Sequence, residues 1–203
     1  MSCIVRGWDR LQQVNAPKEN SKILILGAGI IGNLWMSLLH HKGFRDVIVS
    51  ELSPIRQQLA KKLDTGFKIV GPEELAQFMP QTRLEAELEG IDVIIDCTGS
   101  AKALEQALFY VARGATILIF GCAPVGQKMG ICPEEIFAKE LTILGTQIDP
   151  FTYGRAVALA KNMGSRYLDL ARLGIEVFQL GQFQEAIGIL KQGKVSKVMF
   201  KLN

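Results

Sequence analysis

The sequence has few residues of the types that hold metals or form disulfides. It contains two histidines and four cysteines in 203 residues. The cysteines are Cys3, Cys97, Cys122 and Cys132. They form no CxxC pair, and their spacing fits neither a zinc knot nor a disulfide framework. His40 and His41 are adjacent, and neighbouring residues on a helix point in different directions. We therefore predict no metal site and no catalytic residue set, and we expect free thiols in a reducing compartment.

A large excess of charge and a long apolar run are also absent. The net charge is +3, and the lysines and arginines are scattered, which argues against nucleic acid as a partner. The apolar run 23–39 is short and interrupted by glycines, which disfavours a membrane span. Residues 1–15 lack the apolar core and cleavage site of a signal peptide. With 48% hydrophobic and 21% charged residues, the composition is typical of a soluble globular protein, and we expect it to be cytoplasmic.

Short apolar strands alternate with helical patterns along most of the chain. The expected strands are 22–26, 47–49, 67–70, 93–95, 115–120 and 141–144. The expected helices are 30–42, 54–63, one or two within 73–89, 102–113 and 133–139. Continuous apolar strands suit a parallel sheet that is covered on both faces. The alternation therefore predicts an α/β protein with a doubly wound parallel sheet.

A glycine-rich loop, Gly27-Ala28-Gly29-Ile30-Ile31-Gly32, joins the first strand to the first helix of this sheet. Gly27 permits a sharp turn, Gly29 leaves the backbone bare for a pyrophosphate, and Gly32 lets the helix lie close to the strand. The helix N-terminus presents free N–H groups to the phosphates. No Lys-Ser/Thr pair follows, as it would in an ATP-type loop. We therefore predict a Rossmann fold that binds a dinucleotide, NAD(H), the alternative being a glycine-rich turn without a ligand.

Residues at the ends of later strands complete the predicted cofactor site. Glu51 follows the last glycine by about 20 residues, where an acid holds the ribose hydroxyls and repels the extra phosphate of NADP. Arg56, about one helical turn further on, is placed to cover the adenine or the ribose edge. The alternative for Glu51 is an acid on the surface without a ligand, and the alternative for Arg56 is a solvated helix residue. Cys97, Thr98 and Gly99 follow the fourth strand and are expected at the ribose on the nicotinamide side, and Phe120 and Gly121 border the same crevice.

The same pattern divides the chain into three parts. Residues 1–20 are expected to form an amphipathic helix and a polar loop, and residues 21–150 the dinucleotide-binding domain. The regular alternation of short apolar strands and helices changes after Pro150. The elements expected there are helix 154–162, strand 175–180, helix 183–191 and strand 195–202. A segment of this length is too short for a large core of its own. We therefore expect residues 151–203 to pack on the sheet or to belong to an incomplete second domain.

These motifs resemble the coenzyme-binding half of the medium-chain dehydrogenases/reductases, the zinc-type alcohol, polyol and threonine dehydrogenase group. The resemblance rests on residues 22–32, 47–53, Arg56, 96–99, 137–146, 183–186 and 197–200. It implies hydride transfer between a nicotinamide and an alcohol or carbonyl carbon, with Thr146 near the nicotinamide. It also implies a homodimer formed through the strand that runs from Leu141 to Thr146. An apolar edge strand that stays unpaired is otherwise an aggregation hazard.

The resemblance places the zinc ligands and the proton relay in a preceding catalytic domain, which the sequence lacks. Residues 1–10 resemble the helix that links that domain to the coenzyme-binding half. We therefore expect an NAD(H)-binding domain of an alcohol- or polyol-type oxidoreductase that is inactive alone. One alternative is a non-catalytic module that senses NAD(H) or dimerises. Another is a zinc-independent reductase of the same superfamily, which would prefer NADPH, and Glu51 argues against it.

Overall fold

Six parallel strands form the main sheet in the computed structural model of the protein, which describes residues 1–202. The strands are β1 Ile23–Leu26, β2 Val47–Ser50, β3 Lys68–Val70, β4 Ile91–Asp96, β5 Val111–Ile119 and β6 Thr142–Gly145. Their order across the sheet is β3-β2-β1-β4-β5-β6. The chain therefore moves outward from β1 in one direction and then in the other, which opens a crevice at the carboxyl ends of β1 and β4. The predicted doubly wound sheet is confirmed.

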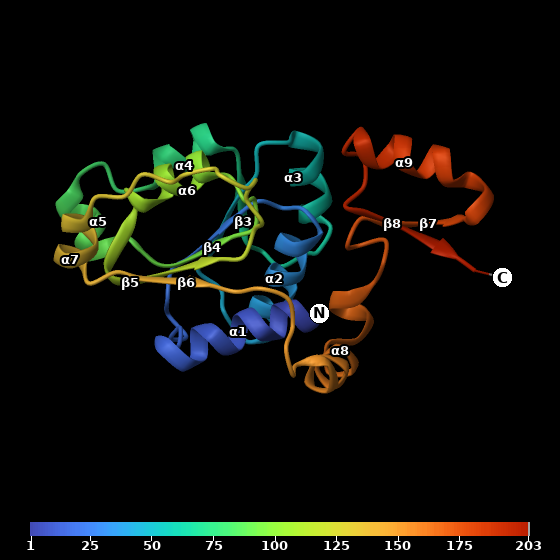
Figure 1. Cartoon of the computed structure of the whole chain (residues 1–203), viewed down its shortest axis with the longest axis horizontal. Coiled ribbons are helices and arrows are strands. Elements are labelled where there is room, and N and C mark those ends of the chain that lie inside the picture. Colours follow the sequence, from blue (N-terminus) through green and yellow to red (C-terminus); the bar gives the residue numbers. More distant parts are fainter. Residues whose placement is uncertain (203) are drawn as a thin grey trace.

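Helices cover both faces of this sheet (Figure 1). They are α1 Ser2–Val14, α2 Ile30–His41, α3 Pro54–Lys61, α4 Pro72–Phe78, α5 Arg83–Glu89, α6 Ala101–Leu108 and α7 Pro133–Lys139. Ile23 and Ile25 of β1 pack in one buried cluster with α1 and α2, whereas Leu24 and Leu26 pack in a second cluster with α6. Because alternate side chains point to opposite faces, a strand covered on both sides is apolar throughout. No helix in residues 1–202 is long and apolar enough to cross a membrane.

The expected helix 102–113 is too long, because α6 ends at Leu108 and β5 already begins at Val111. Val111 pairs with Ile91, and the next pair in register is Thr116 with Val93, so five steps along β5 match two steps along β4. Gly114, with φ +75°, lies in this irregular stretch and adopts a conformation that favours glycine. Residues 111–113 therefore form a strand, because strand pairing and the complete burial of Val111 outweigh the helical pattern.

The chain after β6 forms a separate small unit beside α2 and α3, drawn in orange and red in Figure 1. It contains α8 Tyr153–Leu168, β7 Ile175–Gln179, the 3-10 turn Leu180–Gln182, α9 Phe183–Lys191 and β8 Lys197–Lys201. β7 and β8 pair in parallel as a two-stranded sheet of their own. The expected helix 154–162 is longer in the structure, because α8 continues to Leu168 across a kink at Gly164, where φ is 56°.

The last turn of α8 attaches this unit to α2 and to the turn that follows α3. The Arg166 guanidinium donates to the carbonyl of Leu63 at 2.8 Å, and His40 Nδ1 shares a hydrogen bond of 2.8 Å with the Tyr167 hydroxyl. Burial, followed by the positive charges of Arg45 and Arg166, lowers the pKa of His40 below its ordinary value. His40 therefore favours its neutral form, and its hydrogen bond with Tyr167 connects α2 to α8.

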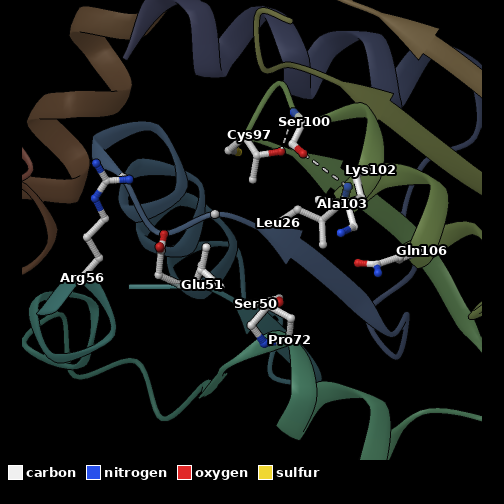
Figure 2. A pocket seen from close by; sticks show the side chains of 14 residues that line it. Leu26, Ser50, Glu51, Arg56, Pro72, Cys97, Ser100, Lys102, Ala103 and Gln106 are labelled. Atoms are coloured by element: carbon white, nitrogen blue, oxygen red, sulfur yellow. Dashed lines mark hydrogen bonds between the residues drawn. The ribbon is translucent and has the colours of Figure 1, made fainter. Parts of the chain in front are cut away.

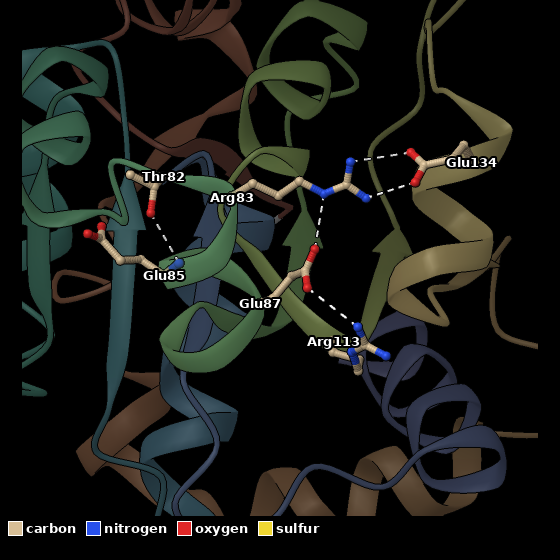
Figure 3. Close-up of polar contacts among 6 residues, drawn as sticks. All are labelled: Thr82, Arg83, Glu85, Glu87, Arg113 and Glu134. Atoms are coloured by element: carbon tan, nitrogen blue, oxygen red, sulfur yellow. Dashed lines mark hydrogen bonds and ion pairs between the residues drawn. The ribbon is translucent and has the colours of Figure 1, made fainter.

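An exposed group of ion pairs connects α5, α7 and β5 at the other end of the molecule (Figure 3). Arg83 contacts Glu87 and Glu134, each at 3.0 Å, and Arg113 contacts Glu87 at 3.4 Å. The hydrogen bond from Arg83 is the main reason that the pKa of Glu87 is lowered. Exposed ion pairs contribute little to stability, so these contacts chiefly orient the two short helices.

Candidate functional site

A pocket of about 510 Å³ lies in the crevice at the carboxyl ends of β1, β2 and β4. The glycine-rich loop, the residues that follow the strands, and α3 and α6 form its walls (Figure 2). The lining residues are Leu26, Gly27, Gly29, Ser50, Glu51, Leu52, Arg56, Pro72, Cys97, Thr98, Ser100, Lys102, Ala103 and Gln106. The pocket therefore occupies the position at which open α/β sheets bind their ligands.

The glycine-rich loop brings the start of α2 against the end of β1. Gly27 has φ +92°, which favours glycine. A Cβ on Gly32 would overlap the carbonyl oxygen of Gly27, so this approach requires glycine. A Cβ on Gly29, in contrast, would meet no atom within 4 Å. Gly32 is thus enclosed by the protein, whereas open space lies in front of Gly29.

The N-terminus of α2 has no capping side chain, because its N-cap residue is Gly29. Ser53 and Ser100, by comparison, cap α3 and α6 by accepting a hydrogen bond from a backbone N–H. The first N–H groups of a helix have no partner within the helix, and they carry the positive end of its dipole. α2 therefore presents donors to the open space at Gly29, an arrangement suited to an anion.

Glu51 connects this loop to the end of β2. Its Oε2 accepts a hydrogen bond from the backbone N–H of Ala28 at 2.7 Å, and its Oε1 accepts one from the N–H of Ser53 at 2.8 Å. The residue is only 6% exposed, so the alternative of a surface acid is wrong. A carboxylate oxygen has two lone pairs, so each of these oxygens has room for a second hydrogen bond. Glu51 thus fixes the loop and retains acceptor capacity toward the pocket that it lines.

A chain of hydrogen bonds at the end of β4 holds the opposite wall. Asp96 Oδ1 accepts from the backbone N–H of Thr98 at 2.9 Å and from its hydroxyl at 2.6 Å. Thr98 Oγ1 in turn accepts from the N–H of Ser100 at 3.0 Å, and Ser100 caps α6. These contacts set the position of α6, so that one face of this helix reaches the pocket.

Six of the predicted site residues line this one pocket: Gly27, Gly29, Glu51, Arg56, Cys97 and Thr98. Burial, and then the nearby Asp96 carboxylate, raise the pKa of the Cys97 thiol well above its ordinary value. Because the thiolate is the reactive and metal-binding form, this thiol is suited to contact a ligand without reacting with it.

The remaining predicted residues are not among those that line the pocket. Gly99 and Gly121 lie in turns that pack closely, and a Cβ on Gly121 would overlap the backbone of Gly99. The Phe120 ring packs edge-on against Trp35, with ring centroids 5.6 Å apart, so it faces the core. Ile30 and Ile31 also pack against the core through their side chains. Thr146 follows β6, and its buried hydroxyl has no hydrogen-bond partner within residues 1–202.

Sequence reasoning did not find the wall that α6 contributes. Lys102, Ala103 and Gln106 line the pocket from one face of this helix. Their spacing is that of residues on a single helix face, which is a signal in the sequence. It points to the crevice only once the capping by Ser100 and the position of α6 against the sheet are known.

Metal-binding groups do not gather anywhere in residues 1–202. In that part of the chain, no three His, Cys, Asp or Glu side chains lie close enough together to hold a metal ion, and the four cysteines are free. A zinc ion in a protein needs several such ligands. The described residues therefore do not fit a zinc site.

Comparison with known proteins identifies the family. The model of a family described as zinc-binding dehydrogenase matches residues 31–162, which is more than half of the chain. The chain belongs to this family. It corresponds to the coenzyme-binding half of such dehydrogenases, and the resemblance inferred from the motifs is confirmed.

Similar proteins agree with this assignment. The chain is 25% identical to D-arabinitol dehydrogenase 1 of Uromyces fabae, over 100% of the chain and 56% of that protein. It is 30% identical to L-threonine 3-dehydrogenase of Pyrococcus horikoshii, over 92% of the chain and 53% of that protein. A zinc-binding dehydrogenase from Sinorhizobium meliloti, solved with NADP, matches with a TM-score of 0.75 and 28% identity, over 92% of the chain and 52% of that structure. The chain spans about half the length of these relatives.

The enclosed position of Gly32 leads to a stability prediction. We expect Gly32→Ala to lower the free energy of unfolding by about 1–3 kcal/mol, because the added methyl forces α2 away from the Gly27 carbonyl. For a chain of this size the melting temperature should fall by roughly 3–10 °C in thermal unfolding followed by circular dichroism. Gly188→Ala is the control, because it adds the same methyl in a helix where nothing lies within 4 Å. An unchanged melting temperature for Gly32→Ala would contradict the packing described here.

Proposed function

We propose that the chain binds NAD(H) in this crevice, as the coenzyme-binding part of an alcohol- or polyol-type oxidoreductase. The main support is the uncapped N-terminus of α2, which faces open space at Gly29 and lies beside the Glu51 carboxylate. A pyrophosphate needs backbone donors and room for close approach, and a ribose needs an acceptor for its hydroxyls. The loop offers the first two, and Glu51 offers the third.

In this proposal the pyrophosphate lies against Gly27 and Gly29 and the first turn of α2. Glu51 accepts from the adenosine ribose, and Arg56 covers that end of the pocket. Toward the nicotinamide, the coenzyme meets the turns that follow β4, β5 and β6. The residues proposed to bind it are Gly27, Gly29, Ile30, Ile31, Gly32, Glu51, Arg56, Cys97, Thr98, Gly99, Phe120, Gly121 and Thr146. The Thr146 hydroxyl, which has no hydrogen-bond partner among the described residues, supports a ligand contact there.

Glu51 also supports a preference for NAD(H) over NADP(H). A 2′-phosphate on the ribose would approach a buried carboxylate whose charge cannot move away, since both of its oxygens are bonded to backbone N–H groups. Like charges at such short range repel strongly. The relative from Sinorhizobium meliloti was solved with NADP, so coenzyme preference differs between members of the family under this proposal.

The proposed reaction class is hydride exchange with an alcohol or carbonyl carbon. The bound coenzyme supplies the hydride or accepts it. The relatives are named for D-arabinitol and L-threonine, and both compounds carry hydroxyl groups. We expect residues 1–203 to bind coenzyme without turnover when they are alone, because the described part holds no group of side chains that could bind a metal ion.

The proposed organisation keeps the three parts expected from the sequence. Residues 1–20 form a linking helix and loop, residues 21–150 bind the coenzyme, and residues 151–203 belong to a second domain. The separate β7-β8 sheet supports the last of these assignments. The free cysteines suit a reducing compartment and support a cytoplasmic location.

Gly29→Val tests coenzyme binding without disturbing the fold. The backbone at Gly29 is extended and a Cβ there meets no protein atom, so the variant should fold normally. The branched side chain fills the space proposed for the pyrophosphate, so NADH affinity should fall at least 100-fold. Titration followed by NADH fluorescence measures this change. Gly154→Val, at another open glycine on α8, serves as the control and should bind NADH like the wild type. Equal NADH affinity of Gly29→Val and the wild type would overturn the proposed site.

Glu51→Ala tests the coenzyme preference. Loss of a charged acceptor should weaken NADH by about 1–3 kcal/mol, a factor of roughly 5 to 150. NADPH should lose less affinity, because the repulsion is removed at the same time, so the ratio of the two affinities should shift toward NADPH. Calorimetric titration with both coenzymes gives this ratio, and Glu74→Ala on the exposed face of α4 is the matched control. An unshifted ratio would mean that Glu51 acts only by holding the loop.

The alternative or additional role is dimerisation through β6. This strand lies at the edge of the sheet, and exposed apolar residues lie near it in the chain, among them Phe137 and Ile148. An edge strand of this kind favours pairing with a second copy. We expect Ile148→Lys, at a position that is 67% exposed, to convert a dimer to a monomer in analytical ultracentrifugation. Val157→Lys on α8 should leave the dimer intact. A monomeric wild type would exclude this role.

A further inference from the structure

The pocket wall opposite Glu51 carries two polar side chains that the proposed function does not use. Lys102 and Gln106 both line the pocket from α6. In Figure 2 they lie across from Glu51 and Arg56, and the ammonium and the amide point into the pocket. The two residues are four positions apart, so they lie one above the other on the same helix face.

Gln106 lies where two pockets meet. A second pocket of about 490 Å³ shares Leu26, Ser50, Pro72, Ala103 and Gln106 with the first and continues past Ala76. Gln106 therefore stands at the junction, across from Glu51, and three of the residues that line both pockets with it are apolar: Leu26, Pro72 and Ala103. A flat ring with apolar faces and a polar edge is the chemical group that fits such a junction.

We propose that Gln106 recognises the adenine base of the dinucleotide through a pair of hydrogen bonds. A glutamine amide matches adenine in two places: its carbonyl accepts from the N6 amino group, and its NH2 donates to N7. The inference rests on the proposed function, because a pyrophosphate at Gly29 and a ribose at Glu51 direct the base toward α6. Gln106 thereby becomes a specificity-determining residue for the base.

Lys102 contributes differently. Its ammonium only donates hydrogen bonds, so it cannot accept from the N6 amino group. Its charge acts on the phosphates whichever base is attached, in the same way that phosphate contacts strengthen binding without selecting a base. Lys102→Met is therefore a variant that should lower affinity without changing the preference for the base.

The experiment compares NADH with reduced nicotinamide hypoxanthine dinucleotide, in which an oxo group replaces the N6 amino group. The wild type should bind NADH about five- to tenfold more tightly, which corresponds to about one lost hydrogen bond. Gln106→Ala and Gln106→Met should bind the two compounds equally, with NADH affinity reduced by a similar factor. Gln106 is exposed on α6, so both variants should fold. Gln13→Ala, an exposed glutamine on α1, should behave like the wild type.

The outcomes separate this inference from the function on which it rests. If the wild type binds NADH but Gln106→Ala keeps the full preference over the hypoxanthine compound, the base is recognised elsewhere and only this inference fails. If the wild type shows no preference between the two compounds, the inference also fails. If the wild type does not bind NADH at millimolar concentration, the proposed function fails and this inference fails with it. Equalised binding in both Gln106 variants, with a retained preference in Lys102→Met, is the result that we expect.

Discussion

The contact between the start of α2 and the end of β1 is the constraint on which the crevice depends. Gly32 lies so close to the carbonyl of Gly27 that no side chain fits between them. This contact leaves the first N–H groups of α2 pointing out of the protein at Gly29. The Glu51 carboxylate then bonds the loop at Ala28, so the end of β2 is fixed to the same point. Backbone packing rather than a set of reactive side chains shapes the pocket.

Local patterns were sufficient to predict this part of the molecule. The four apolar residues of β1, the glycines at 27, 29 and 32, and Glu51 lie within about thirty positions of one another, and each has a physical reason that is visible in the sequence. A strand covered on both faces must be apolar, and a helix that touches a carbonyl needs glycine. Ser53 before Pro54 likewise predicted the start of α3, because a serine cap and a proline in the first turn both favour it.

Contacts between distant residues explain what the sequence did not predict. The residues at 111–113 have a helical pattern, and they become a strand because Val111 pairs with Ile91 across the sheet. The direction of Phe120 depends on Trp35, about eighty-five positions earlier in the chain. The α6 wall of the pocket depends on a hydrogen-bond chain that begins at Asp96. Periodicity along one segment contains no information about such partners.

The segment after β6 shows how a short part of the chain becomes ordered against a larger one. Leu173 and Ile175 pack into the main cluster around α2, Ser196 Oγ accepts from Asn33 Nδ2 at 3.3 Å, and the Tyr167 carbonyl accepts from the Ser37 hydroxyl at 3.4 Å. The segment thus packs against the outer face of α2, the helix whose N-terminus faces the crevice. The strands β7 and β8 are less well covered, since Val177 is 51% exposed and its partner Met199 is 42% exposed. Under the proposal of a second domain, that domain would cover these two apolar side chains, while the contacts with α2 hold the segment beside the coenzyme crevice.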